Sequence, residues 1–451
     1  MKSRAYLLAL AVLALGAFTA CGGKKHDSTP TPAHIRVVNA TKAAGLTLTL
    51  TDTSDSTKVY TVNTGLAAGA AGSYTDVPVA TYNGVASVTG GALAASSSFS
   101  FNYVTDTKYT AIAYERNNTI EVRIIADSIT APSTGFAILT AGNPAPDAGP
   151  LDVYVVPVNT AIDGLNPTIQ YSYSGSITSV NASVSAGNYD IIITAYGKQN
   201  DVRGKISNIA IANQEIAMLL FTSTKGGALV DTTLIQQGAG VTVYPSDLAR
   251  VRLMGTVTAS SSPSIQVGSV GPNGTAVTFI SPKVDNLYNI VPAGTTISSV
   301  GVTIGSGPTV QLTPPVGPLV AGNDYTVLVY GPSSGPAVSL LTDNNQAPTS
   351  ARIRLINVAV PSNSGSGVIT LTDNNLTLVS QLQYGTASAY STVNTGTSVL
   401  NLSSPDQGFP NNPPPAVCNN TTTCNVGLYG VYSLVIGGTN AAPTVWFVKD
   451  R

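Results

Sequence analysis

The chain has 451 residues, of which 43% are apolar and 10% charged, and its formal net charge is -1. So much apolar material with so little net charge argues against an intrinsically disordered protein. It also argues against a nucleic-acid-binding protein, which would gather Lys and Arg on one face. Abundant Gly, Ser, Thr, Ala and Val beside few charges are typical of an exported all-β protein.

Residues 1–20 have the pattern of a secretory signal. Lys2 and Arg4 precede an apolar run from Leu7 to Phe18, and the segment closes on Thr19-Ala20-Cys21. A helix that spans a membrane needs about 18 or more apolar residues, so this run is too short. The ending is similar to the cleavage site of bacterial lipoproteins, in which Cys21 would become the acylated first residue. Several acyl chains on Cys21 would then anchor the protein to a membrane.

Residues 21–33 follow as a polar tether that contains Lys24, Lys25 and prolines. Gly22 stands where lipoproteins retained in the inner membrane often carry Asp. By this resemblance we expect an outer-membrane protein with its modules in the periplasm or at the cell surface. A soluble secreted protein with a cleaved signal is the alternative.

The rest of the chain contains a repeat of about one hundred residues. Each copy begins with a Pro-containing spacer, and the predicted units are 34–134, 135–248, 249–349 and 350–451. Strands are predicted directly after the spacers, at 34–39, 136–139, 250–254 and 352–357. In three of these strands Arg alternates with aliphatic residues, which predicts one charged, solvated face and one buried face. The second copy lacks the Arg residues.

Short strands rich in Val, Ile, Thr and Tyr, with turn signals every 8 to 12 residues or so, favour β-sandwiches. We therefore expect four immunoglobulin-like sandwiches in a row, forming an elongated or curved rod. The alternative is two larger sandwiches, each made from a pair of copies.

Several motifs resemble those of domain of unknown function 4397. They are the Arg-Val-Val-Asn strand at Arg36–Asn39, the segment Asn143–Val155, and the Val-Pro-x-x-Thr-Tyr element at Val77–Tyr82. The resemblance covers 34–240 best and departs from the pattern in copy four, at the insertion 403–423. It implies a repeated, β-rich extracellular module in bacterial exported proteins, and it supplies no catalytic residues.

Cys418 and Cys424 flank a five-residue polar loop and are the only cysteines besides Cys21. In an oxidising envelope, a pair this close predicts a structural disulfide. Redox or metal chemistry is the alternative, but a zinc site would require His or further Cys nearby. The only histidines, His26 and His34, lie at the start of the chain, so we expect no catalytic triad, metal site or cofactor.

Carboxylates and tyrosines leave three further hypotheses. A glycosidase would require two Asp side chains across a cleft, about 5 to 10 Å apart. The Asp-Asn-Asn runs at 343–345 and 373–375 offer oxygen ligands for calcium, although Asx turns explain them as well. Tyr171 and Tyr173 project to one face and are candidates for stacking on a glycan.

We therefore expect a non-enzymatic envelope lipoprotein with a structural or adhesive role and a lipid anchor in the membrane. The alternative partners are envelope glycans, peptidoglycan or surface proteins, and nucleic acid is not among them.

Overall fold

The computed structural model describes residues 31–451 except 92, 117–118, 128–129, 146, 172–179, 238, 259–263, 268–276, 281–283, 285, 298, 305, 314–317, 347, 349, 362–364, 407–408 and 411–423. Its regular elements within this range are β-strands and one short 3-10 helix, η1 (Thr89–Gly91). None of the helices described is long and apolar enough to cross a membrane. The expected all-β chain is confirmed.

The strands form four consecutive units. Unit 1 consists of β1 (Ala33–Asn39), β2 (Leu46–Asp52), β3 (Val59–Leu66), β4 (Thr75–Val77), β5 (Thr81–Ser87), β6 (Phe99–Asn102), β7 (Lys108–Arg116) and β8 (Thr119–Ala126). Two four-stranded sheets, β4-β1-β7-β8 and β3-β2-β5-β6, enclose one apolar cluster that includes Ile35, Leu48 and Tyr82. Unit 1 is thus a two-layer sandwich around a single core.

Unit 2 has the same plan with longer sheets. It consists of β9 (Phe136–Gly142), β10 (Leu151–Pro157), β11 (Ile169–Tyr171), β12 (Val180–Ser185), β13 (Gly187–Ala195), β14 (Lys198–Ile211), β15 (Ile216–Ser223), β16 (Val230–Gln236) and β17 (Val241–Tyr244). The sheets are β12-β9-β15-β16-β17 and β11-β10-β13-β14, and a second apolar cluster lies between them.

Unit 3 has one four-stranded sheet, β21-β18-β24-β25, and two small ones, β19-β20 and β22-β23. Its strands are β18 (Leu248–Gly255), β19 (Ser264–Val267), β20 (Val277–Ile280), β21 (Tyr288–Pro292), β22 (Val300–Val302), β23 (Val310–Leu312), β24 (Asp324–Tyr330) and β25 (Ala337–Asp343). Val251, Val300 and Val327 belong to its apolar cluster.

Unit 4 ends the chain. Its strands are β26 (Arg352–Asn357), β27 (Ile369–Asp373), β28 (Leu376–Leu382), β29 (Thr386–Ala387), β30 (Ser391–Thr392), β31 (Gly396–Ser398), β32 (Leu400–Ser403), β33 (Cys424–Val426), β34 (Val431–Thr439) and β35 (Ala442–Lys449). The sheet β29-β26-β34-β35, which β30 extends, faces the small sheets β28-β27-β32 and β31-β33 across a fourth apolar cluster.

The first strand of every unit pairs in parallel with a strand near the unit's end: β1 with β7, β9 with β15, β18 with β24, and β26 with β34. An immunoglobulin domain of the constant type instead pairs its first strand with its second. In unit 1, β1 lies between β4 and β7, while β2 lies between β3 and β5. The sheets are consistent with tandem sandwiches. Their strand order differs from that of the constant-type immunoglobulin domain, because the first strand is central and takes a partner from the other end of the unit.

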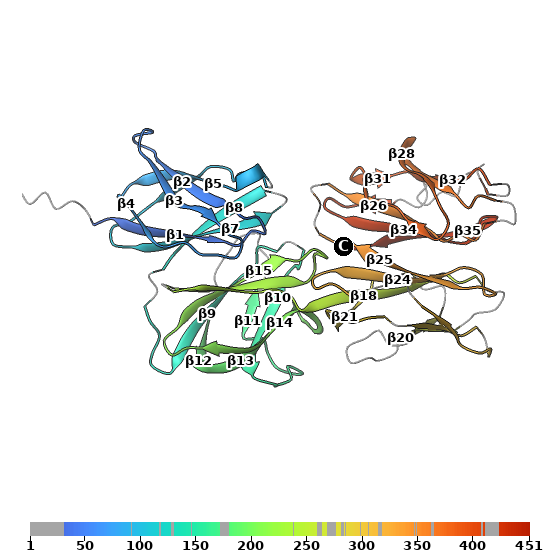
Figure 1. Ribbon diagram of the computed structural model, residues 1–451, viewed down its shortest axis with the longest axis horizontal. Coiled ribbons are helices and arrows are strands. Elements are labelled where there is room, and N and C mark those ends of the chain that lie inside the picture. Colours follow the sequence, from blue (N-terminus) through green and yellow to red (C-terminus); the bar gives the residue numbers. More distant parts are fainter. Residues whose placement is uncertain are drawn as a thin grey trace, which may run out of the picture.

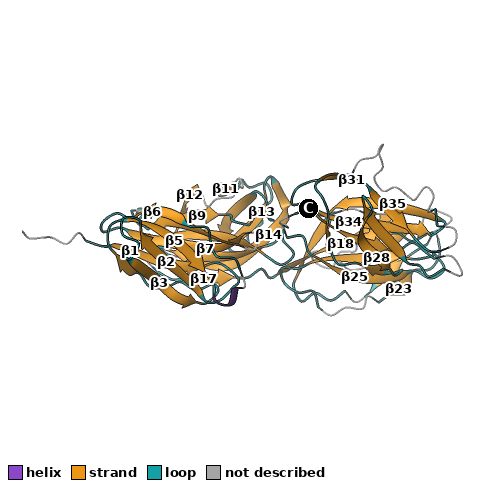
Figure 2. Ribbon diagram, turned by 90° about the horizontal axis from the view of Figure 1, so that it is seen from above, coloured by secondary structure: helices purple, strands orange, loops and turns teal. Residues whose placement is uncertain are grey.

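The units are arranged in two pairs rather than in a single row. Figure 1 shows units 1 and 2 one above the other at one end of the long axis, and units 4 and 3 in the same way at the other end. Turned by 90°, the two pairs lie in line and give an elongated molecule (Figure 2). The expected elongation is present, but the expected single file is not.

Apolar clusters between sheets explain the pairing. Val38 and Ile112 of unit 1 pack on Met218 and Leu220 of unit 2. Between units 3 and 4, Met254 and Leu328 meet Ile356, Val358 and Val435 in the same way. The sheet that carries the first strand of each unit is therefore buried on both faces, one against its own core and one against the neighbouring unit.

Candidate functional site

The structure places the predicted site residues unevenly. Cys21, Cys418 and Tyr173 lie outside the described residues, so acylation and the disulfide stay predictions. Cys424 begins β33 and is buried in the core of unit 4. Tyr171 ends β11, where its backbone is opposite Leu151 of β10.

The structure also describes His34 and the two Asp-Asn-Asn runs that were considered as calcium ligands. The Nδ1 atom of His34 lies 2.6 Å from Asp76 Oδ1 at the edge of unit 1. Within the described residues no three His, Cys, Asp or Glu side chains form a group that could hold a metal ion. In the run at 343–345, the Asp343 carboxylate accepts a hydrogen bond from the Arg354 guanidinium. Asn344 Oδ1 accepts a hydrogen bond from the Gln346 backbone amide, which forms an Asx turn. In the run at 373–375, Asn374 and Asn375 have the positive φ angles of 48° and 70° that suit a tight turn.

A set of four side chains recurs in units 1, 3 and 4. An Arg on the first strand is opposite a Thr or Ser on its parallel partner, an Asp ends or directly follows the last strand, and a Tyr lies on the other side of the Arg. The sets are Arg36, Thr110, Asp127 and Tyr74; Arg252, Thr326, Asp343 and Tyr288; and Arg354, Ser433, Asp450 and Tyr390. In each set the Arg Nε donates to the hydroxyl, at 2.7 to 2.9 Å, and the hydroxyl donates to the Asp.

Between units 3 and 4, the Arg of each set forms an ion pair with the Asp of the other set. Arg252 of unit 3 donates to Asp450 Oδ1 of unit 4 at 2.6 Å, and Arg354 of unit 4 donates to Asp343 Oδ1 of unit 3. The side chains are 0 to 2% exposed where the two ion pairs form. Burial alone would raise the pKa of Asp343, but Arg354 and Arg252 outweigh it and hold that pKa below its usual value. The interface therefore contains two reciprocal ion pairs, as in a two-fold dimer.

The exposed charged face predicted for these strands was wrong. Arg36, Arg252 and Arg354 are 3%, 0% and 2% exposed. The alternation of Arg and aliphatic residues is genuine, but the Arg face packs on a second sheet instead of on water. A sequence can reveal this from Asp127, Asp343 and Asp450, which recur at one place in the repeat and provide each guanidinium with a carboxylate.

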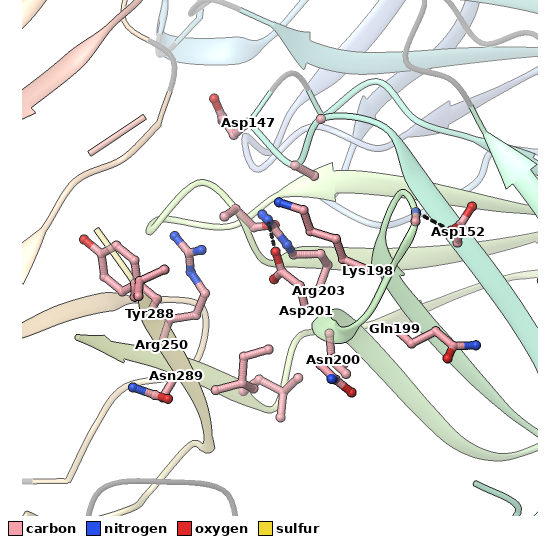
Figure 3. A pocket seen from close by; sticks show the side chains of 18 of the residues that line it. Asp147, Asp152, Lys198, Gln199, Asn200, Asp201, Arg203, Arg250, Tyr288 and Asn289 are labelled. Carbon is pink, nitrogen blue, oxygen red and sulfur yellow. Dashed lines mark hydrogen bonds and ion pairs between the residues drawn. The ribbon is translucent and has the colours of Figure 1, made fainter. Parts of the chain in front are cut away.

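A cleft of about 1420 Å³ lies where units 2, 3 and 4 meet. Asp201 and Arg203 from β14 form an ion pair at 2.7 Å in it, and Figure 3 shows them between Tyr288 and Arg250 on one side and Gln199 on the other. Asp152 accepts a hydrogen bond of 2.8 Å from the Gly197 amide at the far end. The cleft thus draws its polar groups from strands that are distant in sequence.

Charges in the cleft balance, and amides are frequent. Five cationic side chains (Lys198, Arg203, Lys205, Arg250 and Arg451) face five carboxylates (Asp147, Asp152, Asp163, Asp201 and Asp450). Six amide side chains also line it: Gln170, Gln199, Asn200, Asn286, Asn289 and Asn345. A surface without net charge does not select for a polyanion or a polycation, whereas amides can donate to and accept from hydroxyl groups.

Three of the five carboxylates that line the cleft are engaged in ion pairs with arginines, Asp450 among them. Asp201 is paired with Arg203, and Asp147 is paired with Arg451. A general acid requires a carboxyl group with a raised pKa. Burial raises the pKa of Asp373, but this residue lies on β27 and not in the lining of the cleft.

Comparisons with known proteins show only a distant structural similarity to bacterial surface proteins. No family model matches the chain, including one for domain of unknown function 4397, and no curated protein matches it. Among solved structures, a protein assigned to cell adhesion from Bacteroides uniformis is 13% identical, with a TM-score of 0.23, and covers 47% of this chain and 100% of its own. The tip fimbrial protein Mfa3 from Porphyromonas gingivalis is 10% identical, with the same TM-score and coverage.

The major pilin subunit of Bacillus cereus is 13% identical, with a TM-score of 0.14, and covers 70% of this chain and 100% of its own. Scores this low do not establish a common fold.

Proposed function

We propose that this protein is a non-enzymatic lipoprotein of the bacterial outer membrane that has a structural or adhesive role. The observation that supports the proposal is the pairing of its sandwiches through buried, two-sided sheets. Interfaces with apolar clusters and reciprocal ion pairs favour stiff modules, which suit display at a distance from a membrane. Cys21 supplies the anchor in this proposal.

Cells that lack the protein test this role. We expect their attachment to surfaces or to one another to fall, and to recover with the wild-type chain. The Cys21→Ala variant should be exported without an anchor and should not restore attachment. Attachment that is unchanged without the protein, in cells with intact envelopes, would contradict the adhesive and structural roles together.

The cleft supports a second candidate function, capture of a neutral glycan. Its balanced charge and its amides match a ligand rich in hydroxyl groups, and Leu287, which is 65% exposed, adds an apolar surface for sugar C–H groups. Binding of neutral oligosaccharides to the purified protein should weaken in the Asn200→Ala and Asn289→Ala variants. Asn83→Ala, an exposed position on β5, is the matched control. Equal binding by all variants would exclude the cleft as the site.

A further inference from the structure

A cavity of about 280 Å³ lies between units 1 and 2. Unit 1 contributes Arg36, Arg123, Ile124, Ile125, Ala126 and Asp127, and unit 2 contributes Thr140, Ile216, Ala217, Met218, Ile235 and Gln237. The corresponding place in the interface between units 3 and 4 is filled by the side chains of Arg252 and Arg354. The lining of the cavity combines apolar walls with one carboxylate, Asp127, and two guanidinium groups, Arg36 and Arg123.

The strand registers define which residues of unit 2 correspond to the recurring set. Thr140 on β9 is opposite Met218 on β15, as Arg36 is opposite Thr110. The amide of Gln237 donates to the Ile216 carbonyl, as the amide of Asp127 donates to the Lys108 carbonyl. Unit 2 therefore has Thr, Met and Gln at the places where the other units have Arg, Thr or Ser, and Asp.

Units 1 and 2 consequently lack both ion pairs of the kind that joins units 3 and 4, because unit 2 provides neither the Arg nor the Asp. Arg36 finds substitutes for the absent carboxylate, since it donates to the carbonyls of Gln236 and Ala239 at 2.8 and 2.5 Å. Asp127 keeps an ion pair with Arg36, whose Nε atom lies 3.9 Å from its Oδ2 atom, but among the described residues it has no ion pair with a second arginine. Its Oδ2 atom accepts from Thr110 at 2.5 Å and from Tyr74 at 2.6 Å, but no described residue donates to its Oδ1 atom.

The equivalent carboxylate in unit 3, Asp343, shows which groups donate hydrogen bonds at this position. Asp343 Oδ2 accepts from Thr326 and Tyr288, as Asp127 Oδ2 does from Thr110 and Tyr74, and Asp343 Oδ1 accepts from the guanidinium of Arg354 in the neighbouring unit. The side chain of Asp127 is 5% exposed, and Asp127 is among the residues that line the cavity. A buried carboxylate without its full set of partners favours a cation.

We propose that the cavity beside Asp127 binds a guanidinium group, which takes the place that an arginine at position 140 would occupy. The guanidinium donates to Asp127 Oδ1, and its alkyl chain lies against Met218 and Ile235. A second cation near Arg36 is compatible with this site, because Asp343 holds Arg354 while Arg252 Nε lies 3.5 Å from its Oδ2 atom. The planar fork of a guanidinium suits a carboxylate better than an ammonium does.

Binding of agmatine to the purified protein tests the proposal, with n-butylamine and a neutral alkylurea as comparison compounds. We expect saturable binding of agmatine by calorimetry and a higher Tm, with weaker effects of the other two. An arginine-containing peptide distinguishes the source of the group: tighter binding than agmatine indicates a protein partner, and weaker binding indicates a small guanidinium compound.

Three variants locate the site. Asp127→Asn should weaken agmatine binding by about 10- to 100-fold, because hydrogen bonds to charged groups are worth that much. Thr140→Arg should fill the cavity, raise Tm by about 2 to 4 °C and abolish binding. Thr140→Val keeps the size of the threonine side chain and adds no charge, so this variant should retain binding.

Two results would overturn the proposal. One is agmatine binding that is unaffected by both Asp127→Asn and Thr140→Arg. The other is an absence of agmatine binding by the wild type and also by Arg123→Ala, a variant that removes the exposed guanidinium from the lining of the cavity.

Discussion

At the scale of single residues, the molecule depends on a few buried charges in a chain that has few charges altogether. Arg252 and Arg354 are completely buried, and each has a carboxylate from the other unit within reach. Such pairs add little net stability over an apolar contact, but loss of one partner leaves the other as an isolated buried charge. They therefore favour one specific pairing of the units over alternative associations.

Asp343→Asn tests this dependence. Because the variant leaves Arg354 buried without its carboxylate, we expect a loss of about 3 to 5 kcal/mol in the free energy of unfolding at pH 7. The change should be measured by urea unfolding. Asp247→Asn, at an exposed position, is the control and should change it by less than about 0.5 kcal/mol. Equal losses in the two variants would contradict the importance of the buried pair.

The same carboxylate makes stability depend on pH. Its pKa is lowered in the folded state, so the stability it contributes is present above about pH 4, the value for an unfolded Asp. That contribution is lost as the pH falls through the lowered pKa. Between pH 7 and pH 3 the Tm of the wild type should therefore fall more than the Tm of Asp343→Asn. Parallel curves would show that Asp343 keeps an ordinary pKa.

At the scale of elements, the central strands carry apolar residues on both faces, together with a buried Arg on β1, β18 and β26. Successive residues pack on different layers. On β24, Val327 faces the core of unit 3 and Leu328 faces unit 4. On β1, Val37 and Val38 divide in the same way between the core of unit 1 and unit 2. Near-continuous apolar runs are what sheets covered on both faces require.

Leu328→Ala tests whether the second face is a true core. We expect a loss of about 2 to 5 kcal/mol in the free energy of unfolding, as for a buried leucine in a single domain. Leu376→Ala on β28, where the side chain is 64% exposed, is the matched control and should cost little. A small effect at Leu328 would mean that units 3 and 4 separate readily in solution.

Sequence patterns predicted the positions of the strands well, but they did not predict whether a strand face is exposed to water or buried against another sheet. The predicted first strands at 34–39, 250–254 and 352–357 lie within or coincide with β1, β18 and β26. Period-two alternation reveals which residues share a face, but it cannot say whether that face meets water or another sheet. The cleft was beyond prediction for a related reason, since Tyr288 of unit 3 approaches Asp152 and Arg203 of unit 2 only through the packing of the two units.

At the scale of the whole molecule, apolar contacts hold each pair together and polar contacts join the pairs. The described apolar clusters lie within one unit or between units 1 and 2 or 3 and 4. Between the pairs, the Gly226 amide donates to the Gly322 carbonyl, Gln346 donates to the Thr224 carbonyl, and Arg451 pairs with Asp147. The pair, rather than the single unit, is therefore the natural stable body.

Fragments test this hierarchy. A cut at the spacer near Pro245 gives 31–245 and 246–451, and each fragment keeps both faces of its central sheets covered. We expect both to be monomeric and to unfold cooperatively, as judged by size-exclusion chromatography and calorimetry. Unit 3 alone, residues 246–346, would expose Met254 and Leu328 and leave Arg252 without Asp450, so it should aggregate or unfold. A soluble, folded unit 3 would instead favour four independent domains, and the reciprocal ion pairs would then be a contact between finished modules.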